Sequence, residues 1–357
     1  MSLSFLIRIT ETLLVACVGG FLFSWLSLPL PWMLGPLTAV MIYQSSINRS
    51  LTWIPVIKNI GLVVLGVSFG LYYTYETLIQ TLPYLPVYII ITIFLILFSI
   101  CLSYLVTKWI KVDPASSIFG SIPGGLTEMV IVSQTFNANQ AFVTVFQTAR
   151  LVIVLFTVPF LILFLFSGDT ETIKTQLPQG DSEASFSHYL WFILPVFGAF
   201  KFGYLLPAGI MIFPLIITVV LNISPASLPA IPEVLFLSAQ LAVGTSLGRS
   251  IAIKDVINAG RFSFIYGIIA LLLIAFSFLT GWFMAQVTTM DTATAILSAA
   301  PGGVIEMVLT AGMVDADPAV VTSLQLTRIL LILLLVPVGL KWFFIRILKI
   351  PPVNPGK

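Results

Sequence analysis

The chain consists of long apolar segments separated by short polar turns. A helix that crosses a membrane needs about 20 mostly apolar residues, and most segments approach or exceed that length. Six lie in each half, near 5–27, 32–47, 55–72, 83–107, 115–135 and 141–167, and near 189–206, 208–223, 233–249, 262–286, 293–312 and 319–346. This pattern predicts an all-α integral membrane protein.

The second half of the chain repeats the first when the sequence is shifted by 178 residues. Between residues 113 and 159, 18 of 47 positions are identical to their counterparts in 291–337. The identities include Pro, Gly, Glu, Gln and Arg, which shared hydrophobicity would not bring into one register. We therefore predict a tandem duplication, with repeat 1 over 1–167, an acidic linker over 168–188 and repeat 2 over 189–357.

Equivalent loops of the two halves carry opposite charge. The loop between the third and fourth segments holds Glu76 in the first half, and Arg249, Lys254 and Arg261 in the second. Lys and Arg accumulate in cytoplasmic loops, so these two loops are expected on opposite sides of the membrane. That arrangement is typical of inverted-topology repeats with an odd number of crossings each. We predict five crossings per half, both termini cytoplasmic, and the linker periplasmic or extracellular.

A Pro-Gly-Gly sequence interrupts the fifth apolar segment of each half. The two sequences are Pro123, Gly124 and Gly125, and Pro301, Gly302 and Gly303. Because Pro removes a backbone donor and Gly adds freedom, we predict a broken or re-entrant helix in each repeat rather than a simple kink. This segment is our candidate for the one that does not cross fully; the short second segment is the alternative. A new half-helix N-terminus would favour an anion.

An acidic residue follows each Pro-Gly-Gly sequence by three positions, at Glu128 and Glu306. A charge in the centre of a spanning segment costs at least about 2.5–3.5 kcal/mol, so such residues rarely face lipid. A carboxyl group in that setting can exchange a proton or bind a cation. A permanent pair with an Arg is the structural alternative.

Each Glu is followed 22 residues later by Arg150 or Arg328. Gln147 and Gln325 precede these arginines by three positions, hence on the same helical face. This face can bind an interhelical carboxylate or an anionic substrate, and snorkelling to the membrane interface is the alternative.

We predict two sets of site residues. The ion- or proton-coupling residues are Glu128 and Glu306. The substrate-binding residues are Arg150, Arg328, Gln147, Gln325, Gly124, Gly125, Gly302 and Gly303.

Small residues recur in the third segment of each half. Gly66 and Gly70 have their counterparts in Gly244 and Gly248. Small residues let helix backbones approach closely, so we predict close helix packing here. An unwound backbone that lines a ligand site is the alternative.

The composition excludes several classes of protein. The chain is 59% apolar and 8% charged, whereas soluble chains are about 45–50% apolar and 25% charged. Its net charge of +2 without a basic cluster gives no footprint for nucleic acid. One His and two Cys in apolar segments supply no metal-ligand cluster. We therefore expect no nucleic-acid partner, no metal, no cofactor and no enzymatic activity.

The doubled P-G-G-x-x-E-M sequence and the early stretch 31–36, PWMLGP, resemble those of the AbrB-duplication membrane proteins over essentially the whole chain. Members are labelled transcriptional regulators or ammonia monooxygenases, but the residues here provide neither a DNA-reading domain nor a metal site. The resemblance implies a relation to cation–proton antiporters and bile-acid symporters, which have inverted repeats and crossed, broken helices.

These features predict a proton- or Na⁺-coupled secondary transporter of a small polar or anionic metabolite, which works by alternating access in a bacterial cytoplasmic (inner) membrane. The expected partners are the substrate, a coupling cation and the lipid bilayer, and a homodimer is left open. The alternative is a membrane sensor without flux that affects gene expression indirectly.

Overall fold

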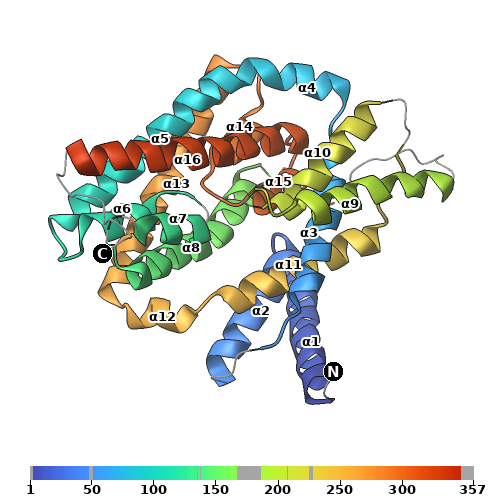
Figure 1. Ribbon diagram of the computed structural model, residues 1–357, viewed down its shortest axis with the longest axis horizontal. Coiled ribbons are helices and arrows are strands. Elements are labelled where there is room, and N and C mark those ends of the chain that lie inside the picture. Colours follow the sequence, from blue (N-terminus) through green and yellow to red (C-terminus); the bar gives the residue numbers. More distant parts are fainter. Residues whose placement is uncertain are drawn as a thin grey trace. The chain divides into compact units, whose positions relative to one another are not determined.

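The computed structural model describes residues 3–47, 51–124, 126–134, 136, 138–166, 186–206, 208–224 and 228–346. Over these residues the ordered elements are all helices (Figure 1). Within the described residues, five stretches are long and apolar enough to cross a membrane: Ile7–Trp25, Tyr75–Thr107, Gln140–Phe166, Arg261–Val287 and Pro318–Phe344. The prediction of an all-α membrane protein is confirmed at this level.

The helices of the two halves recur in the same order and at the spacing of the sequence repeat. α6 (Pro114–Ser121) and α14 (Thr292–Ala299) are 178 positions apart at both ends. The short helices α4 (Tyr75–Thr81) and α12 (Ile253–Asn258) begin 178 positions apart. The duplication is therefore visible in secondary structure as well as in sequence.

The chain divides into two compact units, and each unit takes residues from both halves. Unit 1 consists of Met1–Pro83, Pro159–Ala252 and Val308–Thr322, and unit 2 of Tyr84–Val158, Ile253–Met307 and Ser323–Lys357. The units therefore cut across the two halves of the sequence.

Unit 1 contains the first helices of each half. From the first half these are α1 (Leu3–Trp25), α2 (Pro31–Ile47), α3 (Pro55–Gly70) and α4. From the second half they are the 3₁₀ helix η2 (Phe186–Phe192), α9 (Ile193–Phe202), α10 (Gly209–Ile223) and α11 (Glu233–Ser250).

The helices of unit 1 pack through glycines in a reciprocal manner. A Cβ on Gly66 in α3 would lie 2.4 Å from the carbonyl oxygen of Met211 in α10, and a Cβ on Gly244 in α11 would lie 2.3 Å from that of Met33 in α2. Gly244 follows Gly66 by 178 positions, and Met211 follows Met33 by 178 positions. Equivalent positions of the two halves therefore make equivalent contacts in unit 1. The close packing predicted for these glycines is confirmed.

Unit 2 contains the later helices of each half. From the first half these are the end of the 3₁₀ helix η1 (Leu82–Tyr84), α5 (Leu85–Thr107), α6, α7 (Leu126–Gln134) and most of α8 (Gln140–Phe166). From the second half they are α12, α13 (Arg261–Val287), α14, the first turn of α15 (Val304–Ala311) and most of α16 (Pro318–Arg346).

The apolar core of unit 2 surrounds the first of its short helices. Phe119 in α6 stacks on Phe136 at a centroid distance of 5.9 Å and on Phe344 of α16 at 5.8 Å. Ile118 and Ile122 are buried in the same cluster. α6 therefore packs against residues from both halves of the sequence.

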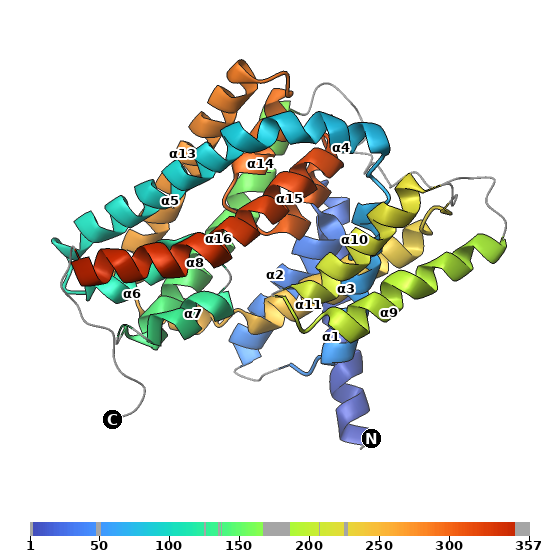
Figure 2. The ribbon, with the colours of Figure 1, turned by 45° about the horizontal axis from the view of Figure 1, so that its top comes forward.

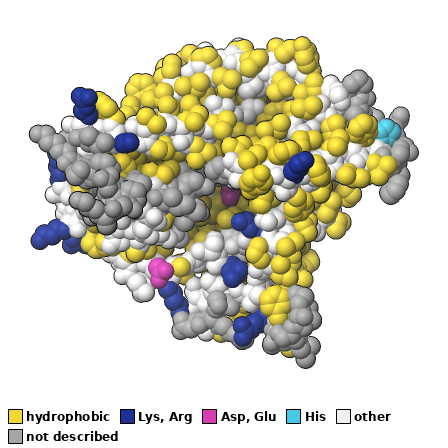
Figure 3. All heavy atoms as spheres, in the orientation of Figure 1, with side chains coloured by type: hydrophobic (Ala, Val, Ile, Leu, Met, Phe, Trp, Pro, Cys, Tyr) yellow, Lys and Arg dark blue, Asp and Glu magenta, His cyan; other side chains and the backbone are white. Residues whose placement is uncertain are grey.

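Many large apolar side chains lie on the outer surface. Figure 3 shows hydrophobic side chains over most of the described part of one face, with few charged ones. Phe164 is 84% exposed, and Leu334 and Val338 are each 70% exposed. Patches of this extent would be a liability in water, whereas a lipid environment accommodates them.

Candidate functional site

The Pro-Gly-Gly sequences lie in breaks between short helices of unit 2. In the second half, α14 ends at Ala299 and α15 begins at Val304, with Pro301 to Gly303 between them (Figure 2). In the first half, α6 ends at Ser121 and α7 begins at Leu126. Of the residues between these two helices, Gly125 lies outside the described part of the chain.

Both broken helices begin with the same cap. The Asp113 Oδ1 accepts a hydrogen bond from the Ser116 N–H at 2.7 Å, and the Asp291 Oδ2 accepts one from the Thr294 N–H at 2.9 Å. Asp at the N-cap satisfies a free backbone donor. The start of each short helix is therefore specified by its sequence, and the break by Pro-Gly-Gly.

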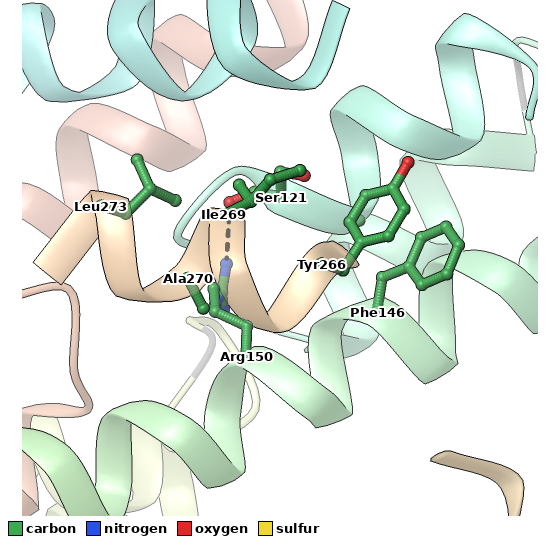
Figure 4. Close-up of a pocket in the computed structure, with 8 residues that line it drawn as sticks. Ser121, Phe146, Arg150, Tyr266, Ile269, Ala270 and Leu273 are labelled. Carbon is green, nitrogen blue, oxygen red and sulfur yellow. Dashed lines mark hydrogen bonds between the residues drawn. The ribbon is translucent and has the colours of Figure 1, made fainter. Parts of the chain in front are cut away.

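The carbonyl groups at the first break are bound by side chains of α8. Gln147 donates from Nε2 to the carbonyl oxygens of Phe119 at 2.6 Å and Ile122 at 3.1 Å. Arg150 donates from Nη1 to Ile122, and from Nη2 to the Gly124 carbonyl at 3.2 Å. Figure 4 shows the Arg150 side chain directed at the same turn, where Nη1 lies 3.5 Å from the Ser121 carbonyl.

The second break has the same arrangement. Gln325 in α16 donates from Nε2 to the carbonyl oxygens of Leu297 at 2.7 Å and Ala300 at 3.3 Å. Arg328 donates from Nη1 to the carbonyl of Ala300 and from Nη2 to that of Gly302. The Arg328 Nη2 also donates to the Gln325 Oε1.

These contacts explain why a Gln-x-x-Arg face occurs twice. A helix end leaves carbonyl groups without intrahelical partners, and a cation there is stabilised by the helix dipole. Arg150 and Arg328 are only 7% and 5% exposed, so neither side chain snorkels to the membrane interface. The side chains of these Gln and Arg residues donate to backbone carbonyls. The spacing of side chains in the sequence does not reveal partners of this kind.

Glu306 lies at the N-terminus of the second half-helix. It is 4% exposed and occupies the first turn of α15. A Cβ on Gly303 would lie 2.1 Å from its Oε2, so the carboxyl group folds back over the residue that precedes the helix. The chain thus places its own acidic group where the half-helix N-terminus favours an anion. Glu128 falls in α7, but its side chain lies outside the described part.

Two buried tyrosines join the broken helices to long helices of the other half. Tyr88 in α5 donates from its hydroxyl to the Ser298 carbonyl in α14 at 2.9 Å. Tyr266 in α13 donates to the Ser117 Oγ in α6 at 2.6 Å. They are 0% and 2% exposed and lie 178 positions apart. The sequence analysis missed them, although the repeat register alone would have paired them.

A narrow pocket lies beside Arg150 and Tyr266 (Figure 4). Ser121 and Phe146 also line it, and the Phe146 and Tyr266 rings stack at a centroid distance of 3.5 Å. The pocket is too narrow to hold a water molecule. The Arg150 Nε is buried and has no hydrogen-bond partner among the described residues. One guanidinium donor thus remains beside the break.

The part of the chain that the structure describes contains no group of three or more His, Cys, Asp or Glu residues that could hold a metal ion. The charged residues buried in that part are Arg150, Glu306 and Arg328. All three lie at the broken helices of unit 2.

Comparisons with known proteins found a family match and similar bacterial proteins. Residues 32–344 match the model of the AbrB family, which is described as transition state regulatory protein AbrB. A Bacillus subtilis (strain 168) protein named uncharacterized protein YhjN is 24% identical over 350 residues, which cover 90% of both chains. An Escherichia coli (strain K12) protein named putative regulator AbrB is 27% identical over 267 residues, which cover 71% of this chain and 72% of that protein.

Proposed function

The chain belongs to the AbrB family, and from that premise we propose that it is a secondary transporter with two inverted repeats, which moves a small polar or anionic metabolite by coupling it to H⁺ or Na⁺. One observation carries the proposal: both halves contribute a helix broken at Pro-Gly-Gly, and a buried Gln and Arg bind the carbonyls at each break. Broken helices inside a membrane form ion and substrate sites in secondary transporters. A chain without flux has no evident need for two such breaks.

The division into two compact units supports the same proposal. Alternating access requires one body to move against another around a site. Here each unit takes helices from both halves, as expected if the repeats supply equivalent parts to each body. Unit 2 holds the breaks, and we propose that it carries the site.

Glu306 and Glu128 are the proposed coupling residues. Glu306 is buried in the first turn of α15, where a change in its protonation or cation occupancy alters the charge at the half-helix end. An anionic metabolite would compete with the ionised carboxylate for that position. Coupling then follows, because neutralising Glu306 favours binding of the anion.

The contacts of Arg150 and Arg328 favour a positioning role over direct substrate binding. Their Nη donors are engaged with carbonyls at the breaks. We propose that they hold the broken backbone in place, with Gln147 and Gln325, and that the glycines next to each break line the substrate path. The Arg150 Nε has no hydrogen-bond partner among the described residues, so it is the guanidinium donor that a substrate could still engage.

Purified protein in liposomes tests the proposal. An imposed Na⁺ gradient or an added panel of small carboxylates should change the internal pH, read by an enclosed dye, or drive uptake of a labelled panel member. E306Q combined with E128Q should abolish the coupled signal. The matched control is D255N in α12, an exposed acid, which should transport like the wild type. Full coupled transport in E306Q/E128Q would refute the role of the acids.

A membrane sensor without flux is the second candidate, and the name of the Escherichia coli relative, putative regulator AbrB, favours it. It predicts that a ligand binds and stabilises the purified protein while liposomes show no flux in any gradient. Flux in liposomes would exclude this candidate.

A further inference from the structure

We propose that unit 2 binds an anionic phospholipid in a groove between α5 and α16, with its acyl chain along the groove and its phosphate near Lys108 and Arg346. The groove has a volume of about 400 Å³ and is lined by residues of both helices, which run alongside each other in Figure 2. Its lining includes Ile93, Leu97 and Ile100 from α5, and Val338, Gly339 and Trp342 from α16.

The groove is open and faces outward. Leu97, Val338 and Trp342 are 55%, 70% and 59% exposed, and both helices belong to stretches that can cross a membrane. A Cβ on Gly339 would meet nothing within 4 Å, so the helix surface is indented there. A hydrocarbon chain suits this surface because the lining is aliphatic and aromatic.

One end of the groove is aromatic and cationic. The Tyr104 ring of α5 meets that of Phe343 of α16 edge-on at 6.5 Å, and the Lys108 Nζ lies 5.4 Å from the centre of the Tyr104 ring. Arg346 follows Trp342 and Phe343 by four and three positions, on the same helical face. Lys108 and Arg346 are both exposed. Aromatic residues beside cations mark the membrane–water interface, and two cations there complement an anionic headgroup.

A second copy of the chain is a less suitable occupant than a lipid. Two copies related by an axis along the membrane normal would bring equal ends of the groove to the same depth. Lys108 and Arg346 of one copy would then approach the same cations of the other, and like charges at an interface are unfavourable.

Quenching of Trp342 by brominated lipids tests the headgroup preference. The full chain is placed in phosphatidylcholine vesicles that contain a small fraction of brominated phosphatidylglycerol or, separately, brominated phosphatidylcholine. The signal of Trp342, one of seven tryptophans, is the difference from W342F. We expect stronger quenching by brominated phosphatidylglycerol than by brominated phosphatidylcholine. K108Q/R346Q should lower that preference by up to about 25-fold, since each cation near an anionic surface contributes about a factor of five.

The matched charge control is K254Q/R261Q, which removes two exposed cations of the same unit and should keep the preference. A preference unchanged in K108Q/R346Q would overturn the proposed headgroup site.

Filling the groove tests the acyl-chain part. G339F should displace the brominated lipids and reduce Trp342 quenching by both of them, whereas G339A adds one methyl group and should leave quenching unchanged. A Cβ at this position meets nothing within 4 Å, so neither variant introduces a clash at its Cβ. Quenching that G339F leaves intact would overturn the proposal. A change of oligomeric mass in G339F, with lipid quenching unaltered, would instead identify the face as an interface between copies.

Discussion

Gly303 and Glu306 are packed so closely that a Cβ on Gly303 would lie 2.1 Å from the Oε2 of Glu306. The glycine therefore allows the acidic side chain to fold back over the start of α15. Gly303, the third residue of the Pro-Gly-Gly sequence, leaves room for the side chain of Glu306 three positions later. This contact explains why Pro-Gly-Gly and the acid occur together in one motif.

The variant G303A should displace the Glu306 carboxyl group without straining the backbone, because Gly303 does not have a positive φ. Loss of a carboxylate at a helix N-terminus costs about 1 kcal/mol of stability. Coupled transport in liposomes should fall, as we also expect for E306Q. The control is G339A in α16, whose Cβ would meet nothing within 4 Å and which lies away from the breaks. Equal transport by G303A, G339A and wild type would contradict the proposed role of the contact between Gly303 and Glu306.

Removal of a guanidinium group from a break should destabilise the fold. R328Q removes the side-chain donor of the Gly302 carbonyl, at a cost of about 1–3 kcal/mol for an unsatisfied group. The Ala300 carbonyl also loses its bond to Arg328 but keeps the one from Gln325. R328K keeps the charge but loses the planar fork that reaches two acceptors, so its loss should be intermediate. Thermal unfolding in detergent measures both.

The control for this series is R261Q, in which an exposed Arg is replaced and the change should stay within about 0.5 kcal/mol. If R328Q unfolds at the temperature of the wild type, the hydrogen bonds to the break do not stabilise the protein.

The glycine contacts of unit 1 predict equal effects at equivalent positions. G66A and G244A each drive a Cβ against a backbone carbonyl, at 2.4 and 2.3 Å. Overpacking against backbone costs about 1–3 kcal/mol, and the two losses should be similar because the contacts are reciprocal. G339A is the matched control, since its Cβ meets nothing within 4 Å and Ala favours a helix by up to about 1 kcal/mol. A tolerated G66A with a damaging G244A would show that the contacts are not equivalent.

The sequence predicts the helical membrane fold and the close packing at Gly66 and Gly244, because hydrophobic length and small residues are visible in the chain. It does not predict how the helices group into units. Unit 2 joins residues 84–158 to 253–307. Such long-range packing depends on the shapes of the helix surfaces, and apolar segments of similar composition do not reveal which of them pack together.

The candidate site shows the same division. Gln147 and Arg150 are predicted on one helical face, yet their acceptors are carbonyls of Phe119, Ile122 and Gly124. Every residue carries a carbonyl group, so the sequence does not distinguish the few that a helix break leaves free. The sequence does not single out Tyr88, because one Tyr in an apolar segment resembles an ordinary core residue. Its counterpart 178 positions later, Tyr266, is the feature that distinguishes it.

Opposite orientation of the two halves predicts opposite accessibility of equivalent loops. Gln80 in α4 and Asn258 in α12 lie 178 positions apart, and both are exposed. α4 carries Glu76, whereas α12 carries Lys254 and is flanked by further cations. Since Lys and Arg favour the cytoplasmic side, Q80C should react with a membrane-impermeant maleimide added to intact cells, and N258C should react only after the membrane is opened.

The parent for both variants replaces Cys17 and Cys101, the two native cysteines, and it should show no labelling under either condition. If Q80C and N258C are labelled from the same side, each half crosses the membrane an even number of times. The repeats are then parallel, and the Pro-Gly-Gly segments cross fully. Labelling from opposite sides requires an odd number of crossings per half, which places the two broken helices in inverted orientation around the proposed site.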